Sequence, residues 1–234
     1  MIQTFYVDHM GTDLSVANAA RVSFGKRSEM DTSDVWGPPK LKDKDAKLIR
    51  YLAKHKHISP FGHCFASFHV KAPVFVARQL VKHKFLRWNE ISRRYVDSEP
   101  KFYEPTEWRG RSLDTKQGSK GVVEVKPQYN TYQGDEFSQF GDWWTTVEDY
   151  YEDAVYFYEH LLEQGVCPEQ ARMVLPQSMV TEWYWSGSLD AFADMCNLRC
   201  KPDTQYETQV VAGHIDTEMA KLFPVSWKAL RENE

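Results

Sequence analysis

A strand-like run that leads through a proline into a helical stripe is the feature that most constrains the fold. Residues 64–70, CFASFHV, are rich in aromatic and β-favouring residues, which is typical of a strand. Pro73 fits the first turn of a helix, where its fixed φ is suitable and its missing N–H is not needed. Apolar residues then recur at helical spacing, at Val74, Ala77, Val81 and Phe85. The passage therefore predicts a strand that passes directly into a helix.

Polar residues occupy the other side of this predicted helix. Gln79, Lys82 and His83 are spaced three and four residues apart, so one helical face would bring them together. We therefore expect the strand-to-helix passage to deliver polar side chains to one place. The segment that continues from there, residues 82–95, has the sequence KHKFLRWNEISRRY.

Residues 82–95 concentrate positive charge in a chain whose formal net charge is −4. The side chains that are basic, or can become so, are Lys82, His83, Lys84, Arg87, Arg93 and Arg94. Arg and Lys bind phosphate oxygens through charge-assisted hydrogen bonds, so the cluster predicts a local anion site. A nucleic-acid-binding protein would more often spread such an excess over a whole face and raise the pI, which is about 6.1 here.

The second half of this segment suggests how a phosphate would be held. Ser92 and Arg94 alternate in a stretch that we expect to be extended, so they would face the same side and bind one phosphate together. Glu90 has two interpretations. It forms a salt bridge that neutralises Arg87 or Arg94, or it recognises a donor such as a sugar hydroxyl or a ring N–H. The residues by themselves predict an anionic small-molecule site and go no further.

Common cofactor and catalytic motifs are absent from the sequence. The chain contains neither GxxxxGKS/T nor GxGxxG, so neither a P-loop nor a Rossmann unit is supported. It has no HExxH and no GxSxG. Four histidines lie close together, at His55, His57, His63 and His69, but their spacing matches no common zinc pattern and we expect no metal site.

The cysteines and the apolar runs indicate where in the cell the protein is expected to lie. Cys64, Cys167, Cys196 and Cys200 form no CxxC pair, and we expect reduced thiols in a cytoplasmic protein. No apolar run approaches the length of a membrane span. The first residues lack the basic start and apolar stretch of a signal peptide.

Apolar periodicity and capping residues predict the remaining elements. The expected helices are residues 13–22 after Thr12, 43–55, 137–162, a segment starting at Pro168, 189–199 and 206–223. Residues 181–185, TEWYW, resemble a strand, and residues 23–43 read as a loop. Residues 105–135 are rich in polar residues and glycine, which predicts a surface excursion or lid. Without an internal repeat or a clear boundary, we expect one domain spanning residues 1–234.

Several separated motifs resemble those of the flavin-dependent thymidylate synthases, the thymidylate synthase complementing protein family. The family signature places Arg-His-Arg, Asn-Glu, Ser and Arg-Tyr at fixed spacings, where this chain has Lys82-His83-Lys84, Asn89-Glu90, Ser92 and Arg94-Tyr95. HISPFGHCFASFHVKAPVFVARQ, ARMVLPQ around Arg172 and NLR at Arg199 are also similar to the family. The resemblance covers most of the chain apart from residues 105–135. It implies an α+β fold, a single mixed domain with a sheet packed by long helices.

The resemblance also implies roles for single residues. Those that match family contacts to FAD are Ser59, Lys82, His83, Lys84, Asn89 and, with a changed residue type, Asp194. Those in or beside the dUMP-binding positions are Gln79, Glu90, Ile91, Ser92, Arg93, Arg94, Arg172 and Arg199. His57 matches a histidine beside the flavin and the folate. The residues implied in catalysis are Arg199, Ser92 and His57, with Arg199 near the uracil ring.

The chain departs from the family pattern mainly at the flavin contacts. Lys82 and Lys84 replace arginines and keep the charge but lose the bidentate fork, and Arg87 replaces a serine. Further changes are Gly62 where Glu is usual, Asp190 and Asp194 where Arg and Asn are usual, and Asp203 where His is frequent. These changes bear on flavin binding more than on the nucleotide pocket.

The reaction implied by the resemblance is the reductive methylation of dUMP to dTMP by an FAD-dependent methyltransferase. Methylenetetrahydrofolate donates the carbon, and FAD reduced by NADPH supplies the hydride. The family forms homotetramers with shared active sites, and neither a nucleic acid nor a membrane is an expected partner. Two alternatives remain: a related flavin enzyme that modifies a pyrimidine nucleotide differently, for instance by hydroxymethylation, and a non-enzymatic nucleotide- or nucleic-acid-binding protein.

Overall fold

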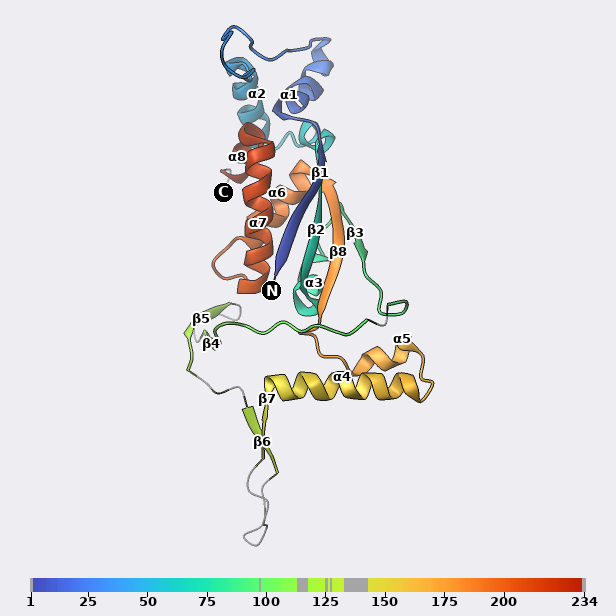
Figure 1. Cartoon of the computed structure of the whole chain (residues 1–234). Helices are drawn as coiled ribbons and strands as arrows, with labels where there is room; N and C mark the ends of the chain where they lie inside the picture. The colour runs from blue at the N-terminus through green and yellow to red at the C-terminus, as the bar shows by residue number, and fades with distance from the viewer. Residues whose placement is uncertain are drawn as a thin grey trace.

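The computed structural model describes residues 2–96, 98–112, 118–124, 126, 128–132 and 143–232. A four-stranded antiparallel sheet forms its centre, in the order β1-β2-β8-β3. Helices α6, α7 and α8 lie on one face of the sheet, and α1 and α2 extend beyond its end (Figure 1). The predicted α+β fold is confirmed.

The described elements have the following bounds. The strands are β1 Gln3–Met10, β2 Phe65–Pro73, β3 Leu86–Glu90, β4 Arg109–Arg111, β5 Ser119–Val122, β6 Gln128–Tyr132, β7 Trp143–Thr146 and β8 Val180–Ser188. The α-helices are α1 Asp13–Arg21, α2 Asp43–Lys54, α3 Val74–Leu80, α4 Val147–Glu163, α5 Pro168–Ala171, α6 Leu189–Arg199, α7 Tyr206–Leu222 and α8 Pro224–Arg231. Short 3-10 helices are η1 Val22–Phe24, η2 Ser59–His63 and η3 Arg172–Val174.

The core lies between the sheet and helices α6 and α7. Successive side chains of a strand point to opposite faces, and the fully buried Phe68, Trp183 and Trp185 occupy the inner face of β2 and β8. Phe192 of α6 meets Phe68 edge-on, with 5.3 Å between ring centroids, and Trp185 at 5.6 Å. Aromatic pairs favour this edge-to-face arrangement, which fixes α6 against the sheet.

The strand-to-helix passage is confirmed, but its helix is shorter than predicted. Pro73 caps α3, which ends at Leu80. Val81 and Phe85, predicted in the apolar stripe, are 47% and 82% exposed, and Phe85 has a positive φ. The chain turns here because it must return to pair as β3 with β8. Gly187 of β8 permits that pairing, since a Cβ there would overlap the Leu86 side chain.

Two further predictions were wrong in detail. Ser92 and Arg94 do not lie in an extended stretch, because β3 ends at Glu90 and residues 93–95 form a turn. The long helix begins at Val147, since Trp143–Thr146 is strand β7, which pairs with β6; residues 137–142 of that prediction lie outside the described residues. The predicted excursion at 105–135 contains hairpin β4–β5 and strand β6.

Asp13 joins the first helix to the last. Its two carboxylate oxygens accept hydrogen bonds from the backbone N–H groups of Val225 (2.9 Å) and Ser226 (2.8 Å) at the start of α8. Asp13→Ala would leave one buried and one partly buried N–H group without acceptors. We therefore expect a loss of about 2–4 kcal/mol in the free energy of unfolding. Urea unfolding measures it, with exposed Asp153→Ala as control. Equal losses in both variants would contradict this role.

Candidate active site

Three residues predicted to bind ligands meet where α3 and α6 end. Arg199, the last residue of α6, donates from Nε to His83 Nε2 at 2.9 Å and from Nη2 to the Gln79 carbonyl oxygen at 3.3 Å. We call Gln79, His83 and Arg199 the inner cluster. The sequence placed Gln79 beside His83, and the fold adds Arg199 from more than a hundred residues away.

Helix α7 orients the side chain of Gln79. The Gln79 amide donates to the Gln205 side-chain oxygen, and Gln79 Oε1 accepts from the Thr208 hydroxyl at 3.2 Å. Thr208 is fully buried, so this orientation is set from inside the protein. Sequence reasoning missed Gln205 and Thr208, because nothing local marks a partner that lies so far along the chain.

The inner cluster carries its positive charge on Arg199 alone at neutral pH. Burial, and then the neighbouring Arg199, lower the pKa of His83 to about 4, and burial also lowers the pKa of Arg199. The imidazole is therefore neutral, with Nε2 as an acceptor and the proton on Nδ1. His83 positions the guanidinium and adds no charge to a phosphate site.

The lowered pKa of His83 makes folding stability depend on pH. Since its pKa is about 4 when folded and about 6.5 when unfolded, the unfolded chain binds more protons between these values. The contribution of His83 to the free energy of unfolding is therefore fully present above about pH 6.5, and it is lost as the pH falls toward 4. When the pH is lowered from 7 to 5, the free energy of unfolding should fall by about 1–2 kcal/mol less in His83→Gln than in the wild type. Urea unfolding at both pH values measures this, with exposed His214→Gln as control. Equal losses in all three proteins would contradict the prediction.

A second group, Glu90, Ser92 and Arg94, lies at the free edge of the sheet, and we call it the edge cluster. Thr181 Oγ1 and Trp88 Nε1 donate to the two carboxylate oxygens of Glu90, at 2.7 and 3.1 Å. The backbone N–H and Nε of Arg94 both lie 3.3 Å from Ser92 Oγ. Ser92 and Arg94 therefore meet through a turn, whereas the sequence predicted a strand.

The edge cluster and the inner cluster remain separate within one chain. Among the described residues, no hydrogen bond or ion pair joins them, and none joins Glu90 to Arg87 or Arg94. Glu90 is thus oriented by neutral donors, which favours its interpretation as a recognition residue. Strand β3, which carries it, pairs only with β8 in the described sheet, so its outer edge is open to another molecule.

The remaining predicted residues lie outside these two clusters. Lys82, Lys84, Asn89 and Arg172 are exposed, and Arg172 lies apart on η3, where its Nε donates to the Glu169 carbonyl at 3.3 Å. Ile91 and Arg93 line a cavity of about 430 Å³ beside the N-terminal end of β8. The Arg93 guanidinium donates to the Ser98 carbonyl, which holds the turn in place.

His57 and Ser59 line another cavity, of about 690 Å³, between α1, α2 and η2. Tyr51 of α2 contributes an aromatic wall, and its ring lies nearly parallel to His57 at 6.3 Å. A planar ring system can stack on such a surface. The structure thus brings two residues predicted near the flavin to one cavity, apart from the inner cluster.

Some side chains at or beside the positions predicted to hold FAD have chemistry suited to that group. Lys82 and Lys84 are exposed cations suited to phosphate oxygens. Asp190, at the start of α6, has a buried Oδ1 without a hydrogen-bond partner among the described residues, and a Cβ at Gly62 would lie 3.9 Å from it. Burial, and then the charge of Asp190, raise the pKa of Asp194. A ring N–H or a sugar hydroxyl would satisfy the free acceptor of Asp190.

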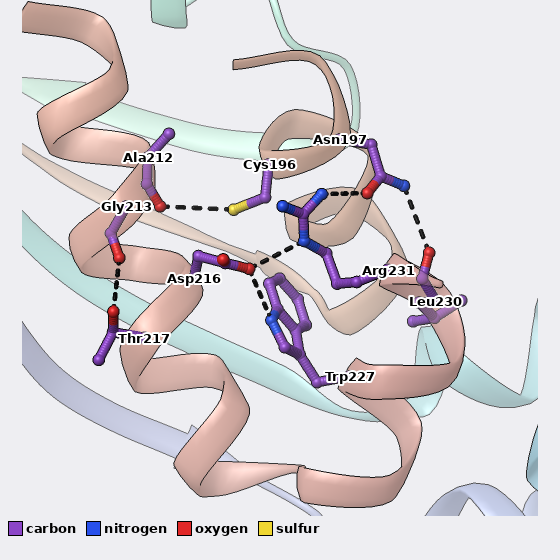
Figure 2. A network of polar contacts seen from close by, with 9 residues as sticks. All are labelled: Cys196, Asn197, Ala212, Gly213, Asp216, Thr217, Trp227, Leu230 and Arg231. Carbon is purple, nitrogen blue, oxygen red and sulfur yellow. Dashed lines mark hydrogen bonds and ion pairs between the residues drawn. The ribbon is translucent and has the colours of Figure 1, made fainter. Parts of the chain in front are cut away.

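A polar network on the far side of α6 fixes the helix that ends in the inner cluster. Asp216 of α7 accepts hydrogen bonds from Trp227 Nε1 at 2.8 Å and from Arg231 Nε at 2.9 Å (Figure 2). Arg231 also donates to the Asn197 side-chain oxygen, and Asn197 donates to the Leu230 carbonyl at 3.3 Å. Helices α6, α7 and α8 are therefore held together by charge as well as by packing.

The cysteines differ in their chemistry. Burial raises the pKa of Cys64 to about 11 and raises that of Cys196 well above its usual value. A hydrogen bond from Cys196 lowers the pKa of Cys200, which follows Arg199 in the chain. The sequence had not predicted a thiol with a lowered pKa. No group of three or more His, Cys, Asp or Glu in the described part of the chain is arranged to hold a metal ion.

The helices of the described residues are also too short or too polar to span a membrane.

Comparisons with known proteins find related sequences and structures. The sequence model of the family "Thymidylate synthase complementing protein" matches residues 6–225. The chain is 36% identical to a "Flavin-dependent thymidylate synthase" of Thermus thermophilus, over 97% of this chain and 74% of that protein. A protein of the same description from Thermosipho melanesiensis is also 36% identical, over 93% and 83%. The structure resembles a crystal structure of "a UMP/dUMP methylase PolB from Streptomyces cacaoi bound with 5-Br dUMP", with TM-score 0.71, 30% identity and coverage of 98% and 94%.

Proposed function

The chain belongs to the thymidylate synthase complementing protein family, and we infer that it is a flavin-dependent thymidylate synthase, a methyltransferase that converts dUMP to dTMP. The observation that carries this inference is the inner cluster. The fold brings Gln79 and Arg199, both at dUMP-binding positions of the family pattern, to one place and holds them by hydrogen bonds. A solved structure similar over nearly the whole chain is that of a UMP/dUMP methylase.

Arg199 has the properties needed to polarise the pyrimidine. Its guanidinium is partly withdrawn from water, so its charge acts through a lower effective dielectric constant. His83 and Gln79 hold it in place, so little reorganisation is needed when charge develops on the ring. We propose that Arg199 draws charge onto the uracil carbonyl and activates C5 without a protein nucleophile. Ser92 is a weaker candidate for a nucleophile, since the described hydrogen bonds of its hydroxyl are to Arg94 and none is to a general base.

The edge cluster would bind the same nucleotide from a second subunit. We propose a homotetramer in which Glu90, Ser92 and Arg94 of one chain complete the site that contains the inner cluster of another. Arg94 and Ser92 would bind the phosphate, and Glu90 would accept a hydrogen bond from the sugar or the ring. Ile91 and Arg93 would shape the wall behind them, and Arg172 would add a second guanidinium. The separation of the two clusters within one chain supports this arrangement.

The cofactors follow from the same proposal. Lys82, Lys84 and Asn89 would hold FAD, with His83 donating from Nδ1, while Ser59 and Asp194 would contact it from η2 and α6. The chemistry that FAD supplies when bound is hydride transfer, and the task of these residues is to bind and orient it. NADPH would be the reductant and methylenetetrahydrofolate the carbon donor, with His57 beside the folate. We also propose that the protein is cytoplasmic.

Flavin binding provides a test that does not need turnover. We expect the purified protein to be yellow, with flavin absorption bands, or to regain them when FAD is added. Lys82→Ala together with Lys84→Ala should weaken FAD binding, and Lys228→Ala, an exposed cation on α8, should not. A colourless protein that cannot be reconstituted with FAD and binds single-stranded nucleic acid tightly would support the non-enzymatic alternative instead.

A further inference from the structure

The Gln79 side chain meets the start of α7 with both ends of its amide. Oε1 accepts a hydrogen bond from the Thr208 hydroxyl at 3.2 Å, and the amide nitrogen donates to the Gln205 side-chain oxygen. A primary amide has two N–H donors and two acceptor lone pairs, so one donor and one lone pair remain. Gln79 is only partly buried, and the remaining donor and lone pair can therefore face a ligand.

Thr208 is placed to act on the Gln79 amide and not on a ligand. Its side chain is fully buried, so no nucleotide can reach its hydroxyl. Because threonine is β-branched, its χ1 angle is restricted in a helix, and its hydroxyl oxygen has few possible positions. The hydroxyl donates to Oε1, which turns the nitrogen end of the amide toward Gln205. The buried threonine thus decides in which direction each end of the Gln79 amide points.

The loop between α6 and α7 contacts Gln79 from both of its ends. Arg199, the last residue of α6, donates from Nη2 to the Gln79 carbonyl oxygen at 3.3 Å. Gln205, which directly precedes α7, accepts from the Gln79 side chain. The backbone and the side chain of Gln79 are therefore held by residues that lie close together in the sequence, and one short segment joins the inner cluster to α7.

This loop is itself fastened by side chains. Thr204 Oγ1 donates to the Leu198 carbonyl oxygen at 3.1 Å. Gln209 Nε2 donates to the carbonyl oxygens of Thr204 at 2.6 Å and Pro202 at 3.3 Å. These hydrogen bonds tie the loop to the end of α6 and to the first turn of α7. Gln205 is thereby fixed in place by the fold, before any ligand binds.

A glutamine side chain that is held in one orientation before binding gives its ligand a higher affinity. In a free side chain several rotamers and two amide orientations compete, and binding must select one of them at a cost in entropy. The contacts with Thr208 and Gln205 make this selection during folding instead. Loss of one such contact is expected to weaken ligand binding by about 3- to 10-fold, the usual net effect of one hydrogen bond or one immobilised side chain.

We propose that Thr208 is a positioning residue for dUMP binding that acts through the amide of Gln79, with Gln205 as the second support. The inference rests on the proposed function, because it takes Gln79 as a residue that contacts dUMP. Since Thr208 is buried, it touches neither the nucleotide nor the flavin. It orients a side chain that recognises the substrate, whereas Arg199 acts on charge that develops during the reaction.

Calorimetric titration of the FAD-loaded protein with dUMP tests the proposal. Thr208→Val keeps the shape of the side chain and loses the hydroxyl, and it should bind dUMP about 3- to 10-fold more weakly. Thr208→Ser keeps the hydroxyl and should bind as the wild type does. Thr217→Val is the matched control, because it makes the same change on the same helix, where the hydroxyl donates to the Gly213 carbonyl oxygen at 2.8 Å (Figure 2). It should leave the dUMP affinity unchanged.

A double-mutant cycle shows whether Thr208 acts through Gln79. In the Gln79→Ala background the amide is absent, so the addition of Thr208→Val should weaken dUMP binding no further. Gln205→Leu gives a second cycle that does not depend on the folding of Thr208→Val, since Gln205 is only partly buried. It should weaken binding about 3- to 10-fold alone and have no effect in the Gln79→Ala background.

Steady-state kinetics separate this role from a merely structural one. If Gln79 binds dUMP equally in the ground state and in the transition state, Thr208→Val raises KM for dUMP and leaves kcat unchanged. A loss of folded protein would instead lower the apparent kcat and leave KM unchanged. We expect KM to rise about 3- to 10-fold, in parallel with the calorimetric dissociation constant.

Three results would overturn the proposal: dUMP binding by Thr208→Val that equals the wild type, binding by Thr208→Ser that is as weak as that of Thr208→Val, or a loss that persists in full when Gln79 is replaced with alanine. If Thr208→Val does not fold, the Gln205→Leu cycle decides in the same way. A protein that forms dTMP and gives any of these results keeps the proposed function and loses only this role. A protein that shows the coupling and forms no dTMP has the role without the proposed reaction.

Discussion

Replacing Arg199 with alanine is expected to lower kcat for dUMP methylation by about 100- to 1000-fold, the usual effect of removing one preorganised donor from a site where charge develops. The guanidinium is partly withdrawn from water and is held by His83 and Gln79, so no solvent molecule can replace both its charge and its orientation. Arg199→Lys should recover only part of the loss, because lysine keeps the charge without the planar fork. Steady-state kinetics with dUMP measure both variants.

Two control variants separate this role from others. Lys228→Ala removes an exposed cation on α8 and should keep full activity. Cys200→Ala removes a thiol that has a lowered pKa and follows Arg199 in the chain. This variant should also turn over normally if no protein nucleophile attacks the ring. An inactive Cys200→Ala that folds and binds dUMP would point to covalent catalysis by that thiol. Normal turnover by Arg199→Ala would refute the assigned role of the arginine.

Mixing two inactive variants is expected to restore activity, which is the second large effect. Arg199→Ala damages the inner cluster and Arg94→Ala damages the edge cluster, and each should be nearly inactive alone. If one site takes its clusters from different subunits, random assembly of equal amounts gives about one site in four with both clusters intact. We therefore expect about a quarter of wild-type activity in mixed oligomers purified through two different tags.

The control for this experiment is a mixture in which both changes lie in one cluster. Arg199→Ala with Gln79→Ala should recover no activity, because no combination of those subunits restores the inner cluster. Mixed oligomers of Arg199→Ala and Arg94→Ala that remain inactive would contradict a shared site. Both clusters would then have to meet within a single chain, which the described residues do not show.

Much of the fold could be predicted from local sequence signals. The capping residue Thr12, the apolar periodicity of residues 43–55 and the aromatic run of residues 64–70 each mark an element that the structure contains. Strand β1 was missed, because most of its side chains are exposed and no apolar alternation marks it. The prediction that Val81 and Phe85 extend the helix was wrong because strand pairing ended it: residues 86–90 complete the sheet beside β8.

The site could be predicted only as far as its residues lie close in sequence. Gln79 and His83 share a turn of chain, so their proximity followed from spacing alone. Arg199 was placed beside them by resemblance to a family, and its contact with His83 depends on how α6 packs against the sheet. Thr181 and Gln205, which orient Glu90 and Gln79, have no local signal, since strand register and helix docking bring them there.

The measurement that tests the central claim most directly is identification of the nucleotide formed from dUMP, methylenetetrahydrofolate and NADPH by the FAD-loaded protein. Chromatography with mass spectrometry separates dTMP from 5-hydroxymethyl-dUMP, and omission of each component in turn shows what the product requires. We predict dTMP, formed only when all components are present. A hydroxymethylated product, or no product from protein that binds both FAD and dUMP, would contradict the assignment as a thymidylate synthase.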